Sequence, residues 1–211
     1  MTNWVGPVTL QGKHVRLEPM TELHIPGLAE IGIGQSFWNY MLYGDIKTEE
    51  DMRYWVLDIL SRVENGTDMP FVAIHLASGR VAGATRYLNI MPKDRGLEIG
   101  GTWYGLDFQR SPVNTECKYL LLAHAFETLR CIRVQLKTDL LNERSQKAIE
   151  RLGAQKEGIL RNHMILPDGR YRDSVFYSIL DWEWPRAKKN LEEMMIKYRK
   201  FESRGIGKTD P

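Results

Sequence analysis

One loop between a predicted strand and a predicted helix carries side chains suited to holding a charged ligand. Residues 109–114 read Gln-Arg-Ser-Pro-Val-Asn and lie within a strand-loop-helix pattern over residues 97–129. Ser111 is a favoured N-cap residue and Pro112 a favoured first helical residue, so a helix is expected to begin here. The free N–H groups and the positive end of a helix start attract phosphate. The loop is therefore a candidate phosphate site, although most helix starts bind nothing.

A second helix start follows the next predicted strand. Asn142 is expected to cap a helix over residues 142–152, with Ser145 in its first turn and Gly153 at its end. An N-cap and a solvated first-turn serine explain both residues by themselves. A ligand role for Asn142 or Ser145 therefore needs support from the rest of the chain.

An alternation of strands and helices positions these two segments. Apolar residues recur at helical spacing behind Thr48, and they alternate with polar residues in the runs expected to be strands. We predict strands within residues 8–18, 71–77, 80–90, 96–104, 132–138, 155–166 and 171–180, and helices over residues 24–33, 48–63, 112–129 and 142–152. This order predicts a mixed α/β fold with helices on both faces of one sheet.

Composition narrows the class of protein. The chain has 211 residues, of which 43% are hydrophobic and 27% charged, as in an ordinary globular domain. No run approaches the roughly 18 apolar residues of a membrane span, and residues 1–10 show no signal-peptide pattern. The two cysteines, Cys117 and Cys131, and the five widely spaced histidines form neither a disulfide framework nor a metal site. We expect a cytoplasmic protein without a bound metal.

Charge is unevenly distributed along the chain. Residues 185–211 contain eight Lys/Arg and four Asp/Glu, whereas residues 1–184 contain 21 and 23. The slightly acidic body argues against direct nucleic-acid binding. We predict one domain over residues 1–184, followed by a basic, amphipathic helical tail over residues 185–211.

Four motifs occur in a fixed order along the chain: Leu97-Glu98-Ile99-Gly100, Gln109-Arg110 to Glu116, Asn142 to Ser145, and Arg151-Leu152-Gly153-Ala154. This ordered set resembles the GNAT N-acetyltransferases, and within them the RimJ/RimL-type ribosomal-protein N-acetyltransferases. The resemblance covers residues 8–184. It implies the GNAT fold, with a mixed, mostly antiparallel sheet of about seven strands. It also implies an enzyme that moves an acetyl group from acetyl-CoA to a primary amine.

The resemblance implies a binding mode for acetyl-CoA. The strands near residues 97–104 and 132–138 would separate and take the pantetheine arm between them, like an extra strand. The residues assigned to cofactor binding are Trp103, Tyr104, Gln109, Arg110, Ser111, Val113, Asn114, Asn142 and Ser145. This chain departs from the family at Pro112 and Asn114, where glycine or a small residue is usual. Proline has no N–H, so at most one donor to the pyrophosphate is lost.

The same resemblance implies catalytic roles for Glu98 and Ser145. Glu98 would draw a proton from the amine through water, and Ser145 would protonate the departing thiolate. A backbone N–H near Trp103 or Tyr104 would meet the developing negative oxygen. At pH 7 deprotonation costs about 1.4 kcal/mol for an α-amine but about 4.6 kcal/mol for lysine, so one glutamate suffices for an N-terminal amine. Glu98 could instead be an exposed cross-strand partner, and Cys117 is expected in the core.

The acceptor is less well defined by the sequence. Phe37, Trp38 and Tyr40 could line its entrance, or they could close the core between two helices. By resemblance the acceptor is a protein N-terminal α-amine. The alternatives are a small-molecule amine, a non-catalytic acyl-CoA-binding module, and a ribosome-docking or nucleic-acid-docking protein that uses the tail. A homodimer is also expected, since open edge strands are often covered by a partner.

Overall fold

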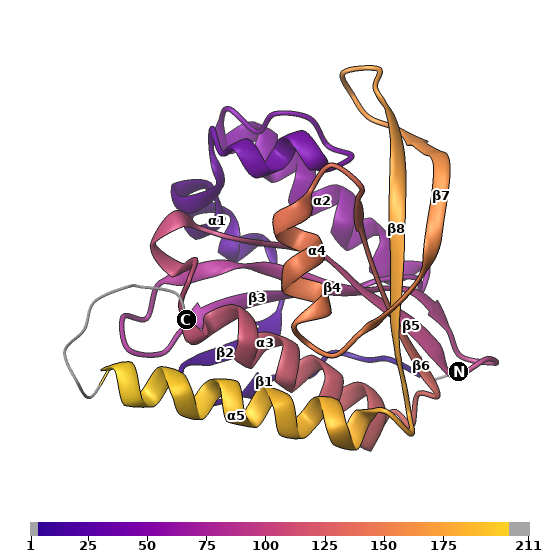
Figure 1. Cartoon of the computed structure of the whole chain (residues 1–211). Coiled ribbons are helices and arrows are strands. Elements are labelled where there is room, and N and C mark those ends of the chain that lie inside the picture. The colour runs from indigo at the N-terminus through magenta and orange to yellow at the C-terminus, as the bar shows by residue number, and fades with distance from the viewer. Residues whose placement is uncertain (1–3, 203–211) are drawn as a thin grey trace.

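The computed structural model describes residues 4–202 and contains one eight-stranded sheet (Figure 1). The strand order is β1-β2-β3-β4-β5-β6-β8-β7. The strands are β1 (Leu10–Gln11), β2 (Val15–Pro19), β3 (Met69–His75), β4 (Val81–Met91), β5 (Gly96–Tyr104), β6 (Arg133–Asp139), β7 (Gln155–Ile165) and β8 (Tyr171–Leu180). Every neighbouring pair is antiparallel except β5 with β6. The predicted mixed, mostly antiparallel sheet is confirmed, with eight strands where about seven were expected, counting the two-residue β1.

Helices cover both faces of the sheet, as predicted. They are α1 (Ile25–Gly32), α2 (Glu49–Glu64), α3 (Pro112–Ala123), α4 (Glu143–Glu150) and α5 (Trp184–Glu202). On one face, the Tyr87 hydroxyl of β4 donates to the backbone of α3 at Leu121, and the Tyr177 hydroxyl of β8 donates to Glu150 of α4. In Figure 1, α5 runs alongside α3, while α1 and α2 lie on the other side of the sheet.

The helix starts are those expected from the cap residues. Thr48 accepts from the Asp51 amide and Asp51 accepts in return from the Thr48 amide, which forms a capping box at the start of α2. Ser111 caps α3 and Asn142 caps α4. The helix predicted over residues 112–129 is α-helical only as far as Ala123. A π-helical turn continues it over His124–Thr128.

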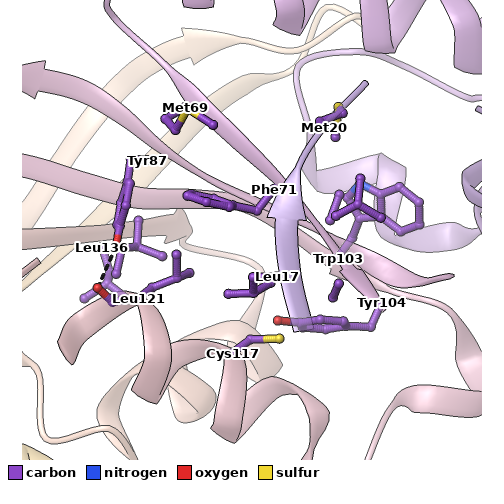
Figure 2. Packing of buried hydrophobic residues seen from close by; sticks show 14 of the residues in the cluster. Leu17, Met20, Met69, Phe71, Tyr87, Trp103, Tyr104, Cys117, Leu121 and Leu136 are labelled. Atoms are coloured by element: carbon purple, nitrogen blue, oxygen red, sulfur yellow. Dashed lines mark hydrogen bonds between the residues drawn. The ribbon is translucent and has the colours of Figure 1, made fainter. Parts of the chain in front are cut away.

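The core lies on both faces of the sheet, against α1 and α2 on one side and α3 on the other, and Figure 2 shows part of it. Phe71 and Tyr87 meet edge to face with ring centroids 5.5 Å apart. Cys117 is fully buried beside Tyr104, as expected for a core residue. Burial raises the pKa of the Cys117 thiol to about 12. This cysteine is therefore a neutral thiol near pH 7 and has no nucleophilic character.

A buried carboxylate joins α3 to the first hairpin. Glu116 is 4% exposed and accepts hydrogen bonds from the backbone N–H groups of Lys13, His14 and Val15, at 2.6–2.9 Å. Gly12 precedes them, and a Cβ at that position would lie 2.4 Å from the Glu116 carboxyl carbon. Glycine at position 12 therefore lets the hairpin backbone close around the carboxylate.

The predicted tail begins as a packed helix. The predicted boundary at residues 184 and 185 falls in the first turn of α5, where Trp184 is buried and its ring stacks on Phe126 at 5.5 Å. Ala187 and Leu191 are also buried, so one face of α5 packs on the domain. The division into domains stays a prediction, and residues 203–211 of the tail lie outside the described residues. Within residues 4–202, no helix is both long and apolar enough to cross a bilayer.

We predict that Glu116→Gln lowers the free energy of unfolding by about 2–4 kcal/mol, because the amide loses the charge and turns an NH2 group toward backbone donors. Urea denaturation of the wild type and the variant measures this change. The matched control is Glu193→Gln, at an exposed position on α5, with an expected change within about 0.5 kcal/mol. Equal stabilities for the two variants would show that Glu116 does not hold the hairpin.

Candidate active site

The strands β5 and β6 part in the middle of the sheet. They pair in parallel only at Gly96 with Arg133, Leu97 with Val134 and Glu98 with Gln135. Beyond Glu98, β5 continues to Tyr104 and β6 continues to Asp139 without pairing to each other. The two facing edges therefore carry backbone N–H and C=O groups that another extended segment can bond.

A bulge in β5 accompanies this parting. The pairing of β4 with β5 shifts between Ala84 and Arg86, and Gly101 has a φ of +56°. Only glycine takes such an angle readily within a strand. Opposite the bulge, a Cβ on Gly83 would lie 2.1 Å from the Trp103 carbonyl oxygen. The two glycines let β4 follow the bent β5 closely while β6 diverges.

The loop that leads from β5 into α3 is fixed by its own side chains. Gln109 donates from Nε2 to the Tyr104 carbonyl at 2.8 Å, and Arg110 has a φ of +54°. The Ser111 hydroxyl donates to the Phe108 carbonyl at 2.5 Å and accepts from the Val113 amide at 3.3 Å. The predicted cap at Ser111 is therefore present, and it already engages the Val113 N–H.

The start of α4 lies just beyond the diverging end of β6. The Asn142 side-chain oxygen accepts from the Ser145 amide at 3.0 Å, which makes Asn142 an N-cap. Its amide NH2 and the Ser145 hydroxyl, both on half-buried residues, have no partner among the described residues. These two polar groups therefore remain available to a ligand held between β5 and β6.

Glu98 is the last residue of β5 that pairs with β6, and it is 2% exposed. Asn89 and Gln135 donate to its Oε2 at 3.0 and 2.9 Å, and the Lys137 ammonium lies 3.4 Å from the same oxygen. Oε1 has no partner within the described part of the chain. A Cβ on Gly100 would lie 3.1 Å from Oε1, so glycine leaves space beside it. Glu98 is thus a held carboxylate with one unengaged oxygen, not an exposed cross-strand residue.

The chain that carries this parting strand pair and these two capped helix starts is similar to known proteins. The family model described as "Acetyltransferase (GNAT) domain" matches residues 14–155. This match covers more than half of the chain. The chain belongs to the GNAT acetyltransferase family. The family expected from the four sequence motifs is therefore confirmed.

Individual GNAT relatives agree with this. "Putative ribosomal N-acetyltransferase YdaF" of Bacillus subtilis is 32% identical over 113 residues, which are 54% of this chain and 61% of that protein. A solved "putative acetyltransferase" from T. thermophilus is 40% identical, with a TM-score of 0.82 and coverage of 90% of this chain and 98% of that one. A GCN5-related N-acetyltransferase from Brucella melitensis is 28% identical, with a TM-score of 0.83 and coverage of 90% and 86%. The name of the first relative agrees with the predicted RimJ/RimL type.

A buried lysine lies beside the β5 bulge of this GNAT domain. Lys118 of α3 is 6% exposed, and its ammonium donates to the Thr102 hydroxyl at 2.8 Å. Thr102 in turn shares a 2.8 Å hydrogen bond with Thr85 of β4. No salt bridge to Lys118 occurs among the described residues, and burial lowers its pKa from 10.5 to about 8. The lysine thus ties α3 to the part of β5 that has left β6.

The predicted acceptor residues differ in their surroundings. Trp38 is 1% exposed, and its indole N–H donates to the Gly32 carbonyl at 2.7 Å within a cluster that includes Trp55 and Trp103. Phe37 and Tyr40 are half-buried in the same 3-10 helix, η2 (Ser36–Tyr40), and the Phe37 ring stacks on Trp103 at 5.3 Å. Trp38 therefore packs as core, while its two neighbours keep part of their surface exposed.

Sequence reasoning did not assign a role to Lys137. The alternation over residues 132–138 indicates a half-buried strand whose polar residues face solvent, yet Lys137 is 11% exposed and pairs with Glu98. Its ammonium also lies 5.6 Å from the centre of the Phe176 ring. The sequence does place a glutamate and a lysine on two neighbouring predicted strands. They can be recognised as an ion pair only when the register between those strands is known.

We predict that Lys118→Met stabilises the protein at pH 7 by up to about 3 kcal/mol, or about 6–12 °C in Tm. The pKa of Lys118 is 10.5 in the unfolded chain and about 8 in the folded chain, so between these pH values the unfolded chain binds more protons. The wild type therefore gains stability as pH rises between these values, and the advantage of the variant shrinks.

Melting temperatures at pH 7 and pH 10 measure this effect. The control is Lys47→Met, whose lysine is 72% exposed. A Lys118→Met variant less stable than wild type at pH 7, with no dependence on pH, would contradict the prediction.

Proposed function

We propose that this protein transfers the acetyl group of acetyl-CoA to a primary amine, and that the amine is the N-terminal α-amine of a protein. The parting of β5 from β6 after Glu98 is the observation that carries this proposal. It supplies an extended, hydrogen-bonding edge that begins beside a buried carboxylate and leads to two helix starts. Membership of the GNAT acetyltransferase family supports the same reaction.

The residues along this edge fit acetyl-CoA. The pantetheine arm carries amide groups that can bond the free edge of β5 near Trp103 and Tyr104, and the Asn142 NH2 can donate to it from the β6 side. The first turn of α3, which contains Asn114 and follows Arg110, offers the positive end of a helix to the pyrophosphate. Ser111 and Val113 bond each other, and Gln109 holds Tyr104, so these three shape the loop in this proposal.

The chain's own groups provide for both proton transfers. When bound, acetyl-CoA supplies an activated thioester. The unengaged Oε1 of Glu98 can accept the proton that the amine releases, directly or through one water, while Lys137 and Gln135 hold Oε2 in place. The Ser145 hydroxyl, which has no partner among the described residues, can protonate the departing thiolate. A backbone N–H at Trp103 or Tyr104 can stabilise the developing negative oxygen.

An α-amine suits this site better than a lysine amine. One carboxylate has to overcome about 1.4 kcal/mol for an α-amine at pH 7 and about 4.6 kcal/mol for lysine. The relative named as a ribosomal N-acetyltransferase favours a ribosomal protein as acceptor, and Phe37 and Tyr40 of η2 would line its entrance in front of Trp38. A small-molecule amine is the alternative acceptor. The cytoplasmic location and the homodimer remain predictions.

We predict that acetyl-CoA at about 100 times its dissociation constant raises the melting temperature by about 5–11 °C, because it adds about 2.7 kcal/mol to the native state. ATP serves as a control for phosphate binding alone and is expected to change the melting temperature little. Differential scanning fluorimetry measures both ligands. No rise with about 1 mM acetyl-CoA would contradict the proposed cosubstrate, and a rise without acetyl transfer to any amine would favour an acyl-CoA-binding module.

We predict that Glu98→Gln lowers kcat by about 100-fold or more with an N-terminal peptide as acceptor, because the amide cannot accept the proton. Thiol release from acetyl-CoA measures the rate, and an unchanged thermal shift with acetyl-CoA shows that the variant is folded. Glu64→Gln, at an exposed position on α2, is the matched control and is expected to keep the wild-type rate. Wild-type kcat in Glu98→Gln would remove Glu98 from the mechanism.

A further inference from the structure

Arg172 of β8 is a buried cation whose one hydrogen-bond partner within residues 4–202 is uncharged. Its side chain belongs to a residue that is 7% exposed, and its Nη1 donates to the Tyr40 carbonyl at 3.0 Å. Its Nε is buried and has no partner among the described residues. A buried guanidinium that bonds only a neutral carbonyl loses most of its hydration without gaining an opposite charge, which is costly.

The neighbouring carboxylates are already paired with other cations. Glu98 pairs with Lys137 at 3.4 Å, and Asp139 pairs with Arg170 at 2.6 Å. Both carboxylates act on Arg172 from a distance, yet burial outweighs them and lowers its pKa. An arginine stays protonated despite such a shift. In the part of the chain that the structure describes, the positive charge of Arg172 therefore has no carboxylate partner.

Further polar atoms without partners lie on the same face of β8. Ser174 follows Arg172 at the spacing that puts both side chains on one face, and its hydroxyl is fully buried and unbonded among the described residues. His163 of β7 lies 5.3 Å from the ring of Phe176, the next residue on that face, and its Nδ1 is also unbonded. Burial and the nearby cations Lys137 and Arg172 lower the His163 pKa, so this ring is neutral at pH 7.

The position of Arg172 relates it to the acceptor. It donates to the Tyr40 carbonyl of η2, which is the segment proposed to line the acceptor entrance. The negative charge of Glu98, the proposed base, also acts on the Arg172 guanidinium and favours its charged form. An acceptor amine near Glu98 would therefore lie within electrostatic reach of Arg172. The loop and helix starts proposed to hold acetyl-CoA supply none of these contacts.

We propose that Arg172, assisted by the Ser174 hydroxyl, binds a carboxylate of the acceptor, so that the enzyme prefers amines that carry a carboxylate. This inference rests on the proposed function and names its substrate class. A planar carboxylate matches the fork of guanidinium donors, and a single negative charge balances the single unpaired cation. A phosphate dianion would need a second unpaired cation. The carboxylate can come from a free amino acid or from an acidic residue at a peptide N-terminus.

The first test compares acceptors with the wild-type enzyme. Peptides with amidated C-termini that differ only as Asp against Asn, or Glu against Gln, at the first or second residue isolate one carboxylate. A comparison of free amino acids with the corresponding amino-acid amides tests whether the carboxylate comes from a free amino acid. We expect kcat/KM to be about 10–100-fold higher for the charged member in one of these two arms, mainly through KM. Equal values within every pair would overturn the inference.

The second test asks whether the preference depends on Arg172. In Arg172→Met we expect kcat/KM for the charged and neutral acceptors of the favoured arm to become equal, because the cation that distinguishes them is gone. Arg172→Lys should restore part of the preference, because it keeps the charge but lacks the fork. Arg161→Met, at an exposed position on β7, is the matched control and should keep the full preference.

The outcomes separate this inference from the proposed function. A thermal shift with acetyl-CoA in each variant shows that the fold and the cosubstrate site are intact. Transfer to neutral acceptors without a charge preference would overturn the role of Arg172 and leave the acetyltransferase proposal standing. Absence of transfer to every amine by the wild type would overturn both. If Arg172→Met does not fold, the wild-type acceptor pairs and Arg172→Lys decide.

Discussion

The parallel contact between β5 and β6 ends after three residue pairs, and the rest of the site depends on this short contact. Parallel strands of a continuous sheet would bond along their whole shared length and leave no backbone group for a ligand. Here β5 carries the bulge at Gly101 and stays paired with β4 up to Tyr104 after its pairing with β6 has ended. The last paired residue is Glu98, so the proposed base lies at the point where the opening begins. The loop to α3 and the start of α4 follow the two strands as they diverge.

Four buried charged residues mark where the structure departs from an ordinary core. Glu116 receives three backbone N–H groups, so its burial is compensated and it stabilises the hairpin of β1 and β2. Glu98 is held by Lys137 and two amides on one oxygen only. Lys118 and Arg172 have no carboxylate partner within residues 4–202 and bond a hydroxyl and a carbonyl, respectively. Uncompensated burial of these two cations lowers stability, which is characteristic of groups kept for a ligand or for the geometry of a site.

The sheet separates two tasks. On the face of α3 and α4 lie the helix starts and the free strand edge that are proposed to hold the cosubstrate, and Cys117 on that side is fully buried. On the other face, η2 crosses toward β8, where Arg172 binds the Tyr40 carbonyl. The aromatic cluster of Trp38, Trp55 and Trp103 supports η2 from beneath. Because Trp103 also belongs to β5, the packing of the side proposed to receive the acceptor is coupled to the strand that parts from β6.

The sequence by itself determined the elements and their starts, since periodicity and caps are local: β8 covers residues 171–180 as predicted, and Ser111 and Asn142 cap their helices. Its ordered motifs also determined the family. Only the tertiary structure decided which residues of distant segments meet. It placed Trp38 in the core and brought Lys137 to Glu98. It also left Arg172 without a carboxylate among the described residues. These outcomes depend on strand register and on how η2 folds over β8, and neither is encoded in the spacing of residues within one segment.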